Sequence, residues 1–548
     1  MSTEDESFHP LGQEWENELE TMLDDTEYDS DLGMQMAEDA MRVTKGELSE
    51  ADFHEKYHDD VMEEFGVDDR PTEEAYEEAQ KNAGGFAEML KSVDSDGEES
   101  RRDMMKKMGA GAAFVGLGAF GAAEGGSESQ PNVAAAQEGD NTEQDVQWGM
   151  AIDLDRCDGC LSCVKACAEE NNLDRGVNWM YVLDYEDDSA VDIGQNRLVR
   201  PCQHCTDAPC EKVCPTTARH TRDKDGLVLT DYDVCIGCRY CQVACPYGVN
   251  YFQWDEPDVS TEDIEAHAHE EMEGEGHEAD HMTDDRGRWV DSRAPRGVMS
   301  KCTMCPTFQD GLAGEEKVGT TACEDACPPD AIQFGNMFDE NSDPQRYADN
   351  PARGRALSDI DMTVPSAAAL EDDLDGADDD LESVLEASQD LDEEDLRIMK
   401  AIEIVSEDFG EGDAEYVEYE QNIIEAFDAL EAHGLDLDSE EVLVGLDLAD
   451  EPDEDEEFDG PSESTAQTVL VNEAGEPESN FQLLQDMGTN PNIIYLGNEP
   501  GPQAKQVDGP VAYEDVEADL ADGRSVPLAD NRKEVLDEMT VGDAGVSL

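Results

Sequence analysis

Two cysteine quartets stand back to back between Arg197 and Tyr251 and constrain this chain more than any other feature. The first has the spacing CxxCxxxxCxxxCP, and the second has the spacing CxxCxxCxxxCP. Three thiolates on one tight loop hold three irons of a [4Fe-4S] cluster, and the fourth cysteine of such a run ligates the other cluster in two-cluster ferredoxins. The proline after each fourth cysteine fixes φ where the chain turns away. Both spacings therefore predict iron-sulfur sites.

Similar quartets lie on both sides of this stretch, and the four quartets together use all sixteen cysteines of the chain. Because the fourth cysteine crosses to a neighbouring cluster, each site combines three cysteines of one quartet with the last cysteine of another. We expect the inner quartets to form one lobe and the outer quartets a second, with four [4Fe-4S] clusters in all. The expected iron ligands are Cys202, Cys205, Cys210 with Cys245; Cys235, Cys238, Cys241 with Cys214; Cys157, Cys160, Cys163 with Cys327; and Cys302, Cys305, Cys323 with Cys167.

Sixteen cysteines also permit two other interpretations, which are eight disulfides in an exported protein and zinc sites built from CxxC pairs. Neither explains third and fourth cysteines that stand at ferredoxin spacing before a proline. We therefore favour iron-sulfur ligation. The alternative from another class is a disulfide-stapled extracellular binding protein.

The quartets and their flanking residues resemble the four-cluster ferredoxin subunit of the dimethyl sulfoxide reductase family. The resemblance covers roughly residues 147–343, includes WGMAIDLDRCDGC and CEDACPPDAIQFG, and returns at residues 481–496. It implies an α+β fold of two pseudo-symmetric ferredoxin-like lobes with acidic helical or irregular extensions. In the related nitrate reductase subunit a tryptophan replaces the second cysteine of the third quartet. Here that position is Cys238, which implies the all-[4Fe-4S] branch.

The resemblance implies an electron-transfer subunit between an integral membrane subunit that reacts with quinol and a molybdopterin-containing catalytic subunit. The sequence shows no nucleophile-base arrangement, no phosphate-cradling glycine loop and no domain large enough for a molybdopterin. We therefore expect no catalytic residue and no direct small-molecule substrate. Similar four-cluster subunits serve hydrogenases and quinol-oxidising respiratory complexes, and these are the alternative function.

The chain carries 139 acidic and 35 basic residues, a formal charge of −104, which excludes nucleic acid as a partner through repulsion. At molar salt the Debye length is only about 3 Å, so such a surface stays hydrated and hardly repels itself. This composition resembles that of extreme halophiles. Charge is close to balanced around the inner quartets, where we expect cations such as Arg200, Arg239 and Lys301 to favour reduced clusters.

A paired arginine, Arg101 and Arg102, precedes a glycine- and alanine-rich run within residues 96–136. The run is short of the roughly 20 apolar residues that a membrane span needs, and it resembles a twin-arginine export signal. Such a signal would export the protein already folded and carrying its clusters. We therefore expect it to lie peripherally on the extracytoplasmic face of the cytoplasmic membrane. Because a signal normally begins a chain, an uncleaved anchor, or a flexible linker in a cytoplasmic protein, stays open.

The other segments complete the predicted organisation of the chain. An acidic helical extension at 1–95, to which we assign no chemistry, precedes the signal-like segment; the cluster core spans 147–349, an acidic helical insertion spans 350–479, and a closing segment with an irregular tail spans 480–548. Helical periodicity predicts helices at 391–405 and 416–432 that could dock a partner, although we expect them to pack on each other.

The core also contains a His- and Glu-rich insertion at 256–288. Its sequence HEADH, at 277–281, matches the zinc-protease pattern HExxH. Glycines precede the match and no apolar stripe accompanies it, so we expect a solvated loop rather than a protease site.

Overall fold

The computed structural model describes residues 9, 13–24, 26–70, 146–174, 176–186, 196–254, 294–361, 364–406, 409–410, 415–450, 452, 458, 460–501, 504–506, 515–519 and 523–528. Three segments discussed above lie outside these residues. They are the N-terminal extension after Arg70, the signal-like segment 96–136 and the insertion 256–288 with its HEADH sequence.

A four-stranded mixed sheet joins distant parts of the cluster core in the order β8-β1-β10-β9. Strand β1 pairs in parallel with β10, which sets Met150 opposite Ile493, and antiparallel with β8, which sets Met150 opposite Phe334. The segment 481–496 thus returns to the core, as its sequence predicts. The strands are β1 (Trp148–Asp153), β8 (Ile332–Asn336), β9 (Asn480–Phe481) and β10 (Ile493–Leu496).

Both faces of this sheet are buried. Because side chains alternate along a strand, Met150 and Ile152 of β1 face the main core, whereas Ala151 packs in the core of a separate helical lobe. This two-sided burial explains why β1 reads as an apolar run rather than as an alternating pattern.

Short elements surround the cysteines in the rest of the core. The strands are β2 (Tyr181–Glu186), β3 (Asn196–Arg200), β4 (Arg219–Thr221), β5 (Val228–Thr230), β6 (Tyr251–Phe252) and β7 (Met299–Ser300). The helices are α6 (Ser162–Glu170), α7 (Pro209–Lys212), α8 (Tyr240–Val243), α10 (Pro306–Gln309), η2 (Glu315–Lys317), α11 (Ala322–Asp325) and η3 (Gln485–Met487). The tail is not wholly irregular, because it adds β11 (Lys505–Gln506) beside β2 and the hairpin β12 (Glu517–Asp519) and β13 (Ser525–Pro527).

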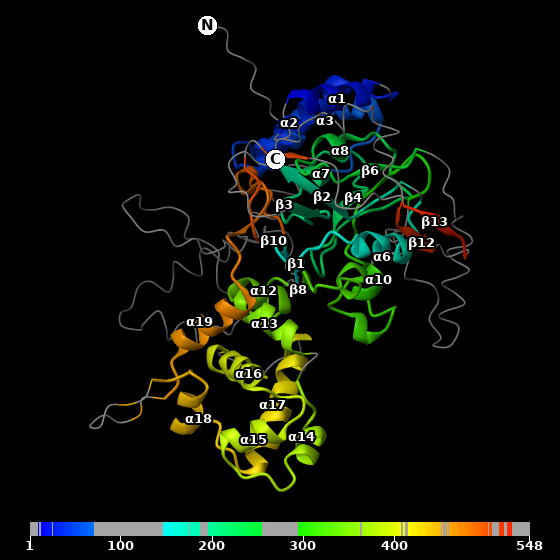
Figure 1. Cartoon of the computed structure of the whole chain (residues 1–548). Helices are drawn as coiled ribbons and strands as arrows, with labels where there is room; N and C mark the ends of the chain where they lie inside the picture. Colours follow the sequence, from blue (N-terminus) through cyan, green and yellow to red (C-terminus); the bar gives the residue numbers. More distant parts are fainter. Residues whose placement is uncertain are drawn as a thin grey trace, which may run out of the picture.

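Three N-terminal helices cover the inner quartets, although the sequence suggested no role for them (Figure 1). They are α1 (Gln13–Asp24), α2 (Ser30–Thr44) and α3 (Glu50–Phe65), and α2 packs on α7 and α8. The close approach requires Gly33, since a Cβ there would lie 2.7 Å from the ring of Tyr240. The Tyr240 hydroxyl donates to the carbonyl of Asp29 at 2.6 Å, and Arg239 donates to the carbonyl of Met22 at 3.3 Å.

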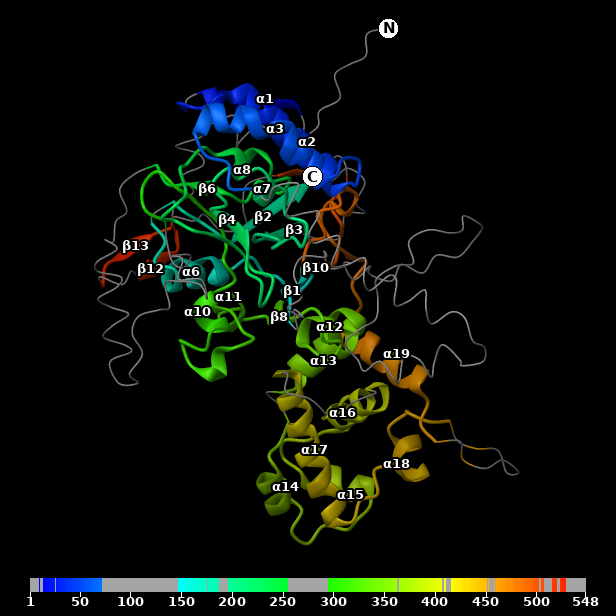
Figure 2. The same ribbon diagram turned by 180° about the vertical axis from the view of Figure 1, so that it is seen from behind.

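Helices α12–α19 extend from the opposite end of the core, and Figure 2 shows most of them as a distinct lobe. They are α12 (Asp343–Asp349), α13 (Pro351–Asp361), α14 (Ala367–Asp373), α15 (Leu381–Ala387), α16 (Glu393–Val405), α17 (Glu415–His433), α18 (Glu440–Gly445) and α19 (Glu463–Ala474). Helices α16 and α17 coincide with the two predicted helices. Their apolar residues share one core, which includes Leu396, Met399, Ile423 and Leu430.

A buried ion pair ties this lobe to the sheet. Asp153, at the end of β1, accepts two hydrogen bonds from Arg355 of α13 at 2.6 and 2.8 Å and one from the Tyr347 hydroxyl at 2.7 Å. Only 1% of the Asp153 side chain and 7% of the Arg355 side chain is exposed. Water and salt therefore screen this pair weakly.

We expect Arg355→Met to lower the free energy of unfolding by about 3–5 kcal/mol, because it leaves the Asp153 carboxylate buried without its cation. Arg397→Met is the matched control in the same lobe, because its guanidinium lies 3.9 Å from a carboxylate of Glu394 that is 57% exposed. The control should change stability by about 0.5 kcal/mol or less. Denaturant unfolding of both variants at molar salt measures the difference, and equal losses would contradict the proposed tie.

Candidate functional site

All sixteen cysteines lie in the described part of the chain, and all are free thiols. Their exposure is graded by position. Cys160 is exposed, four others are partly exposed and the remaining eleven are buried. The partly exposed four are Cys157, Cys214, Cys235 and Cys327.

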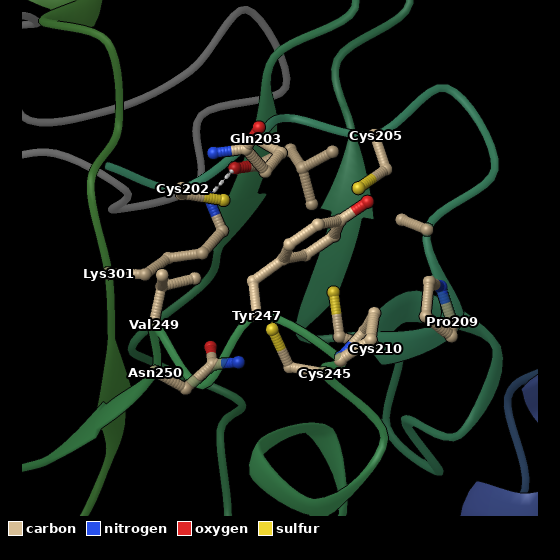
Figure 3. A pocket seen from close by; sticks show the side chains of 13 residues that line it. Cys202, Gln203, Cys205, Pro209, Cys210, Cys245, Tyr247, Val249, Asn250 and Lys301 are labelled. Carbon is tan, nitrogen blue, oxygen red and sulfur yellow. Dashed lines mark hydrogen bonds between the residues drawn. The ribbon is translucent and has the colours of Figure 1, made fainter. Parts of the chain in front are cut away.

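One cavity gathers four cysteines from the two inner quartets, and we call it the Cys202 cavity (Figure 3). Its cysteines are Cys202, Cys205, Cys210 and Cys245, which is the set expected from the crossed spacing. The other lining residues are Gln203, Ala208, Pro209, Val228, Pro246, Tyr247, Val249, Asn250 and Lys301. Apart from Gln203, Asn250, Lys301 and the Tyr247 hydroxyl, this lining is apolar.

A second cavity, which we call the Cys235 cavity, gathers the reciprocal set. Its cysteines are Cys214, Cys235, Cys238 and Cys241. The other lining residues are Pro215, Thr216, Ala218, Arg219, Thr230, Ile236, Gly237, Arg239 and Met299. The structure therefore brings the last cysteine of each inner quartet to the cavity of the other.

Electrostatic effects among the thiols show that the outer quartets also meet. Burial raises the pKa of Cys163, and the next contributions come from Cys323 and then from Cys157, Cys327 and Cys160. Burial likewise raises the pKa of Cys167. The next contributions to this rise come from Cys302, Cys305 and Cys323. Each fourth cysteine of the outer quartets thus lies among the three cysteines of the expected partner.

The same electrostatic effects connect neighbouring cysteine sets. Burial and then Cys202 raise the pKa of Cys302 to about 11, so an outer site adjoins the Cys202 cavity. Burial is the main cause of the raised pKa of Cys210, and Cys241 also contributes to it. The Cys235 cavity therefore adjoins the Cys202 cavity. The eight cysteines of the two middle sites are all buried, whereas both end sites keep partly exposed cysteines.

The loops repeat one backbone pattern. In the CxxCxxC loops, positive φ occurs at Gly159 and Leu161 and again at Gly237 and Arg239, which hold the same positions relative to their cysteines. In the other two loops it occurs at His204 and Met304, each directly before the second cysteine. Such tight turns direct several side chains toward one centre.

The residues fit [4Fe-4S] clusters. Backbone N–H groups of Val249, Tyr247 and Gly248 are directed at the sulfur of Cys245, and the N–H of Arg219 donates to the sulfur of Cys214 at 3.4 Å. Burial followed by neighbouring cysteines raises the pKa of Cys205 well above its usual range. Thiols in such a space ionise when a metal supplies positive charge, and each inner cavity offers the four sulfur ligands that a [4Fe-4S] cluster takes.

Two of the expected cations line the inner cavities. Lys301, in the Cys202 cavity, donates to the carbonyls of Val228 and Cys302, the latter at 2.9 Å. Arg239, in the Cys235 cavity, stacks on Phe252 and Trp254 with ring distances of 4.1 and 3.9 Å.

Arg200 is buried, but it does not line either inner cavity. Sequence reasoning assigned Arg219 no role of its own, although it is 1% exposed and touches cysteines of the Cys235 cavity. Its basic character was visible in the sequence, but its burial was not.

Two family descriptions match parts of the chain. Residues 195–273 match a 4Fe-4S dicluster domain, which covers the two inner quartets. Residues 9–73 match the N-terminal region of 4Fe-4S ferredoxin iron-sulfur binding, which covers helices α1–α3. The core is thus a ferredoxin-like 4Fe-4S protein of α+β structure.

Longer matches connect the chain to respiratory reductases. A Halobacterium salinarum protein assigned as a dimethyl sulfoxide reductase iron-sulfur subunit is 38% identical over 216 residues, which are 37% of this chain and 71% of the relative. The arsenate respiratory reductase iron-sulfur subunit of a Shewanella species is 35% identical over 36% of this chain and 85% of the relative. The menaquinone reductase iron-sulfur cluster-binding subunit of Nitratidesulfovibrio vulgaris is 33% identical over 35% of this chain and 76% of the relative.

The chain therefore belongs to the family of iron-sulfur subunits of the molybdopterin oxidoreductases that include dimethyl sulfoxide reductase. It is an electron-transfer subunit, as the resemblance of its sequence implies. Among the described residues, every helix is too short or too polar to cross a bilayer.

We expect Gly237→Ala to destabilise the protein because Gly237 has φ +68° and a Cβ there would lie 2.1 Å from the carbonyl oxygen of Gly297. Gly46→Ala is the matched control, since Gly46 has φ +72° but nothing lies within 4 Å of its Cβ position. Both variants should lose about 1–2 kcal/mol through the left-handed φ, and Gly237→Ala should lose about 1–3 kcal/mol more through the clash. Thermal unfolding measures the difference, and equal losses would argue against a tightly closed Cys235 loop.

Proposed function

We propose that the chain holds four [4Fe-4S] clusters with the crossed ligand sets and relays electrons between two partner subunits. The sixteen cysteines would be the iron ligands, and the bound clusters would supply one-electron transfer. We further propose that the two lobes are pseudo-symmetric. The repeated positive φ values support this, as do the contacts of α6 with α11 and of α7 with α8, which carry cysteines of corresponding quartets.

The observation that carries this proposal is the graded exposure of the cysteines. The cysteines of the two middle sites are all buried, whereas Cys160 at one end is exposed and Cys235 at the other is partly exposed. Exposed Val234 and Ile236, at 43% and 37%, flank Cys235 and offer an apolar contact for a partner. Such an arrangement suits an electron-transfer chain that electrons enter at one end and leave at the other.

The partners we propose are a molybdopterin-containing catalytic subunit and an integral membrane subunit that exchanges electrons with quinol. The names of the relatives support both, since they are subunits of dimethyl sulfoxide and arsenate reductases and of a menaquinone reductase. No substrate chemistry and no nucleic-acid binding is proposed for this chain. An Archaeoglobus fulgidus relative, the iron-sulfur subunit 1 of an Hdr-like menaquinol oxidoreductase, favours a second candidate, a subunit of a quinol-oxidising complex.

We also propose a halophilic, exported protein that is held peripherally at the extracytoplasmic face of the cytoplasmic membrane. The charge of −104 and the relative from Halobacterium salinarum support the first part. The arginine pair at 101–102, which lies outside the described residues, supports the second. A cytoplasmic location is the alternative.

Anaerobically purified protein should contain about sixteen irons and a similar amount of acid-labile sulfide per chain. Iron and sulfide analysis measures both. Protein with eight disulfides and no iron would instead support the extracellular binding protein, and about four zinc ions would support the zinc interpretation.

The crossed ligands predict reciprocal effects for two single substitutions. Cys214→Ser should alter or remove the cluster of Cys235, Cys238 and Cys241, and Cys245→Ser should alter or remove that of Cys202, Cys205 and Cys210, because serine replaces a thiolate ligand. Electron paramagnetic resonance of the reduced variants, together with iron content, distinguishes the two. The opposite assignment of effects would reject the crossing while leaving iron binding in place.

A further inference from the structure

The side chains of Arg219 and Asn250 span the wall between the two inner cavities. Arg219 lines the Cys235 cavity, and Asn250 lines the Cys202 cavity. Arg219 Nη2 donates to Asn250 Oδ1 at 2.7 Å, and Asn250 Nδ2 donates to the carbonyl of Cys241 at 3.1 Å. The guanidinium is therefore held in one place by a partner that itself is anchored to a cysteine loop.

One cation faces cysteines of both cavities. Arg219 Nη2 lies 3.7 Å from Cys241 Sγ, and the Arg219 backbone N–H donates to Cys214 Sγ at 3.4 Å. Its charge also acts on Cys210 and Cys202 of the other cavity. The thiolates of either site would thus stabilise the same guanidinium.

The guanidinium has donor capacity that the protein leaves unused. The Nε and Nη1 atoms of Arg219 are buried and have no hydrogen-bond partner in the part of the chain that the structure describes. Buried donors are nearly always satisfied, and a buried cation without nearby negative charge is costly. Anionic clusters in the two cavities would supply that charge.

We propose that the Arg219–Asn250 pair is a positioning element that raises the reduction potentials of both inner clusters. The proposal rests on the function proposed above. One electron, supplied by the neighbouring site or partner subunit, adds one negative charge without breaking a bond, and a fixed cation stabilises that charge. Because a guanidinium does not lose its proton in proteins, the effect needs no proton transfer.

At the site of Cys302 the described residues place the charge of Lys301 on Cys302, and no arginine is among the groups that act on its four cysteines. The carboxylates of Glu170 and Glu324 also act on Cys305 and Cys323 of this site. Lys301 adds positive charge beside the Cys202 cavity, but two carbonyl oxygens already accept from its ammonium group. The effect of Arg219 should therefore be confined to the inner pair.

The test is an anaerobic redox titration of the full chain, followed by electron paramagnetic resonance. Arg219→Gln should lower the midpoint potentials of the inner clusters by about 59 mV, a tenfold change in each one-electron equilibrium, and leave the outer clusters unchanged. Asn250→Asp, which places a carboxylate against the guanidinium, should shift them in the same direction. Arg219→Lys keeps the charge and should restore most of the wild-type potential.

Arg222→Gln is the matched control, because Arg222 is fully buried nearby but already pairs with Asp225 and Asp310. It should leave all four potentials unchanged. Unchanged inner potentials in an iron-replete Arg219→Gln protein, or equal shifts at all four clusters, would overturn the proposal. If the Arg219→Gln protein loses iron, unchanged inner-cluster potentials in Asn250→Asp would overturn the proposal instead. Wild-type protein without iron would refute the function proposed above.

Discussion

The structure depends on one requirement, which is that four cysteine sulfurs meet around one buried space. Neither inner cavity draws its four cysteines from a single loop. In the outer lobe, strand pairing in the sheet brings cysteines of different quartets together. Cys157 follows β1 and Cys327 precedes β8, and the Asp153 N–H donates to the Ala331 carbonyl at 2.8 Å where these strands end. Pairing of the two strands therefore brings the two cysteines together, and the strands are apolar because both sheet faces are covered.

Basic residues are concentrated around the buried thiols of the inner lobe. The chain has only 35 basic residues, yet several of them are buried around the inner sites. These are Arg200, Lys212, Arg219, Arg222, Arg239 and Lys301. Acidic residues dominate elsewhere, where water and salt screen their repulsion. Cations in the dry interior are screened far less, although Lys212 and Arg222 already pair with carboxylates.

The added segments are attached to the core by specific contacts rather than by linkers alone. The N-terminal helices pack through Gly33 on Tyr240 and seal the inner lobe on one side. The helical lobe has its own apolar core and is fixed by Arg355 to the buried Asp153. Cys235, with Val234 and Ile236 beside it, stays partly exposed, so its site is accessible despite this covering.

The sequence alone determined the iron-sulfur character, the family, the two longest helices of the insertion and the return of residues 481–496 to the core. These follow from local spacing and periodicity, because a loop that grips a cluster needs its cysteines at fixed intervals. The ligand roles of the sixteen cysteines stay a prediction, although the inner sets meet in two cavities. Only the tertiary structure decided that α1–α3 cover the inner lobe, that the tail adds a strand beside β2 and packs a hairpin on α6, and that Arg219 lies between two sites. Those outcomes depend on which surfaces meet and which charges are buried, and spacing along the chain does not encode them.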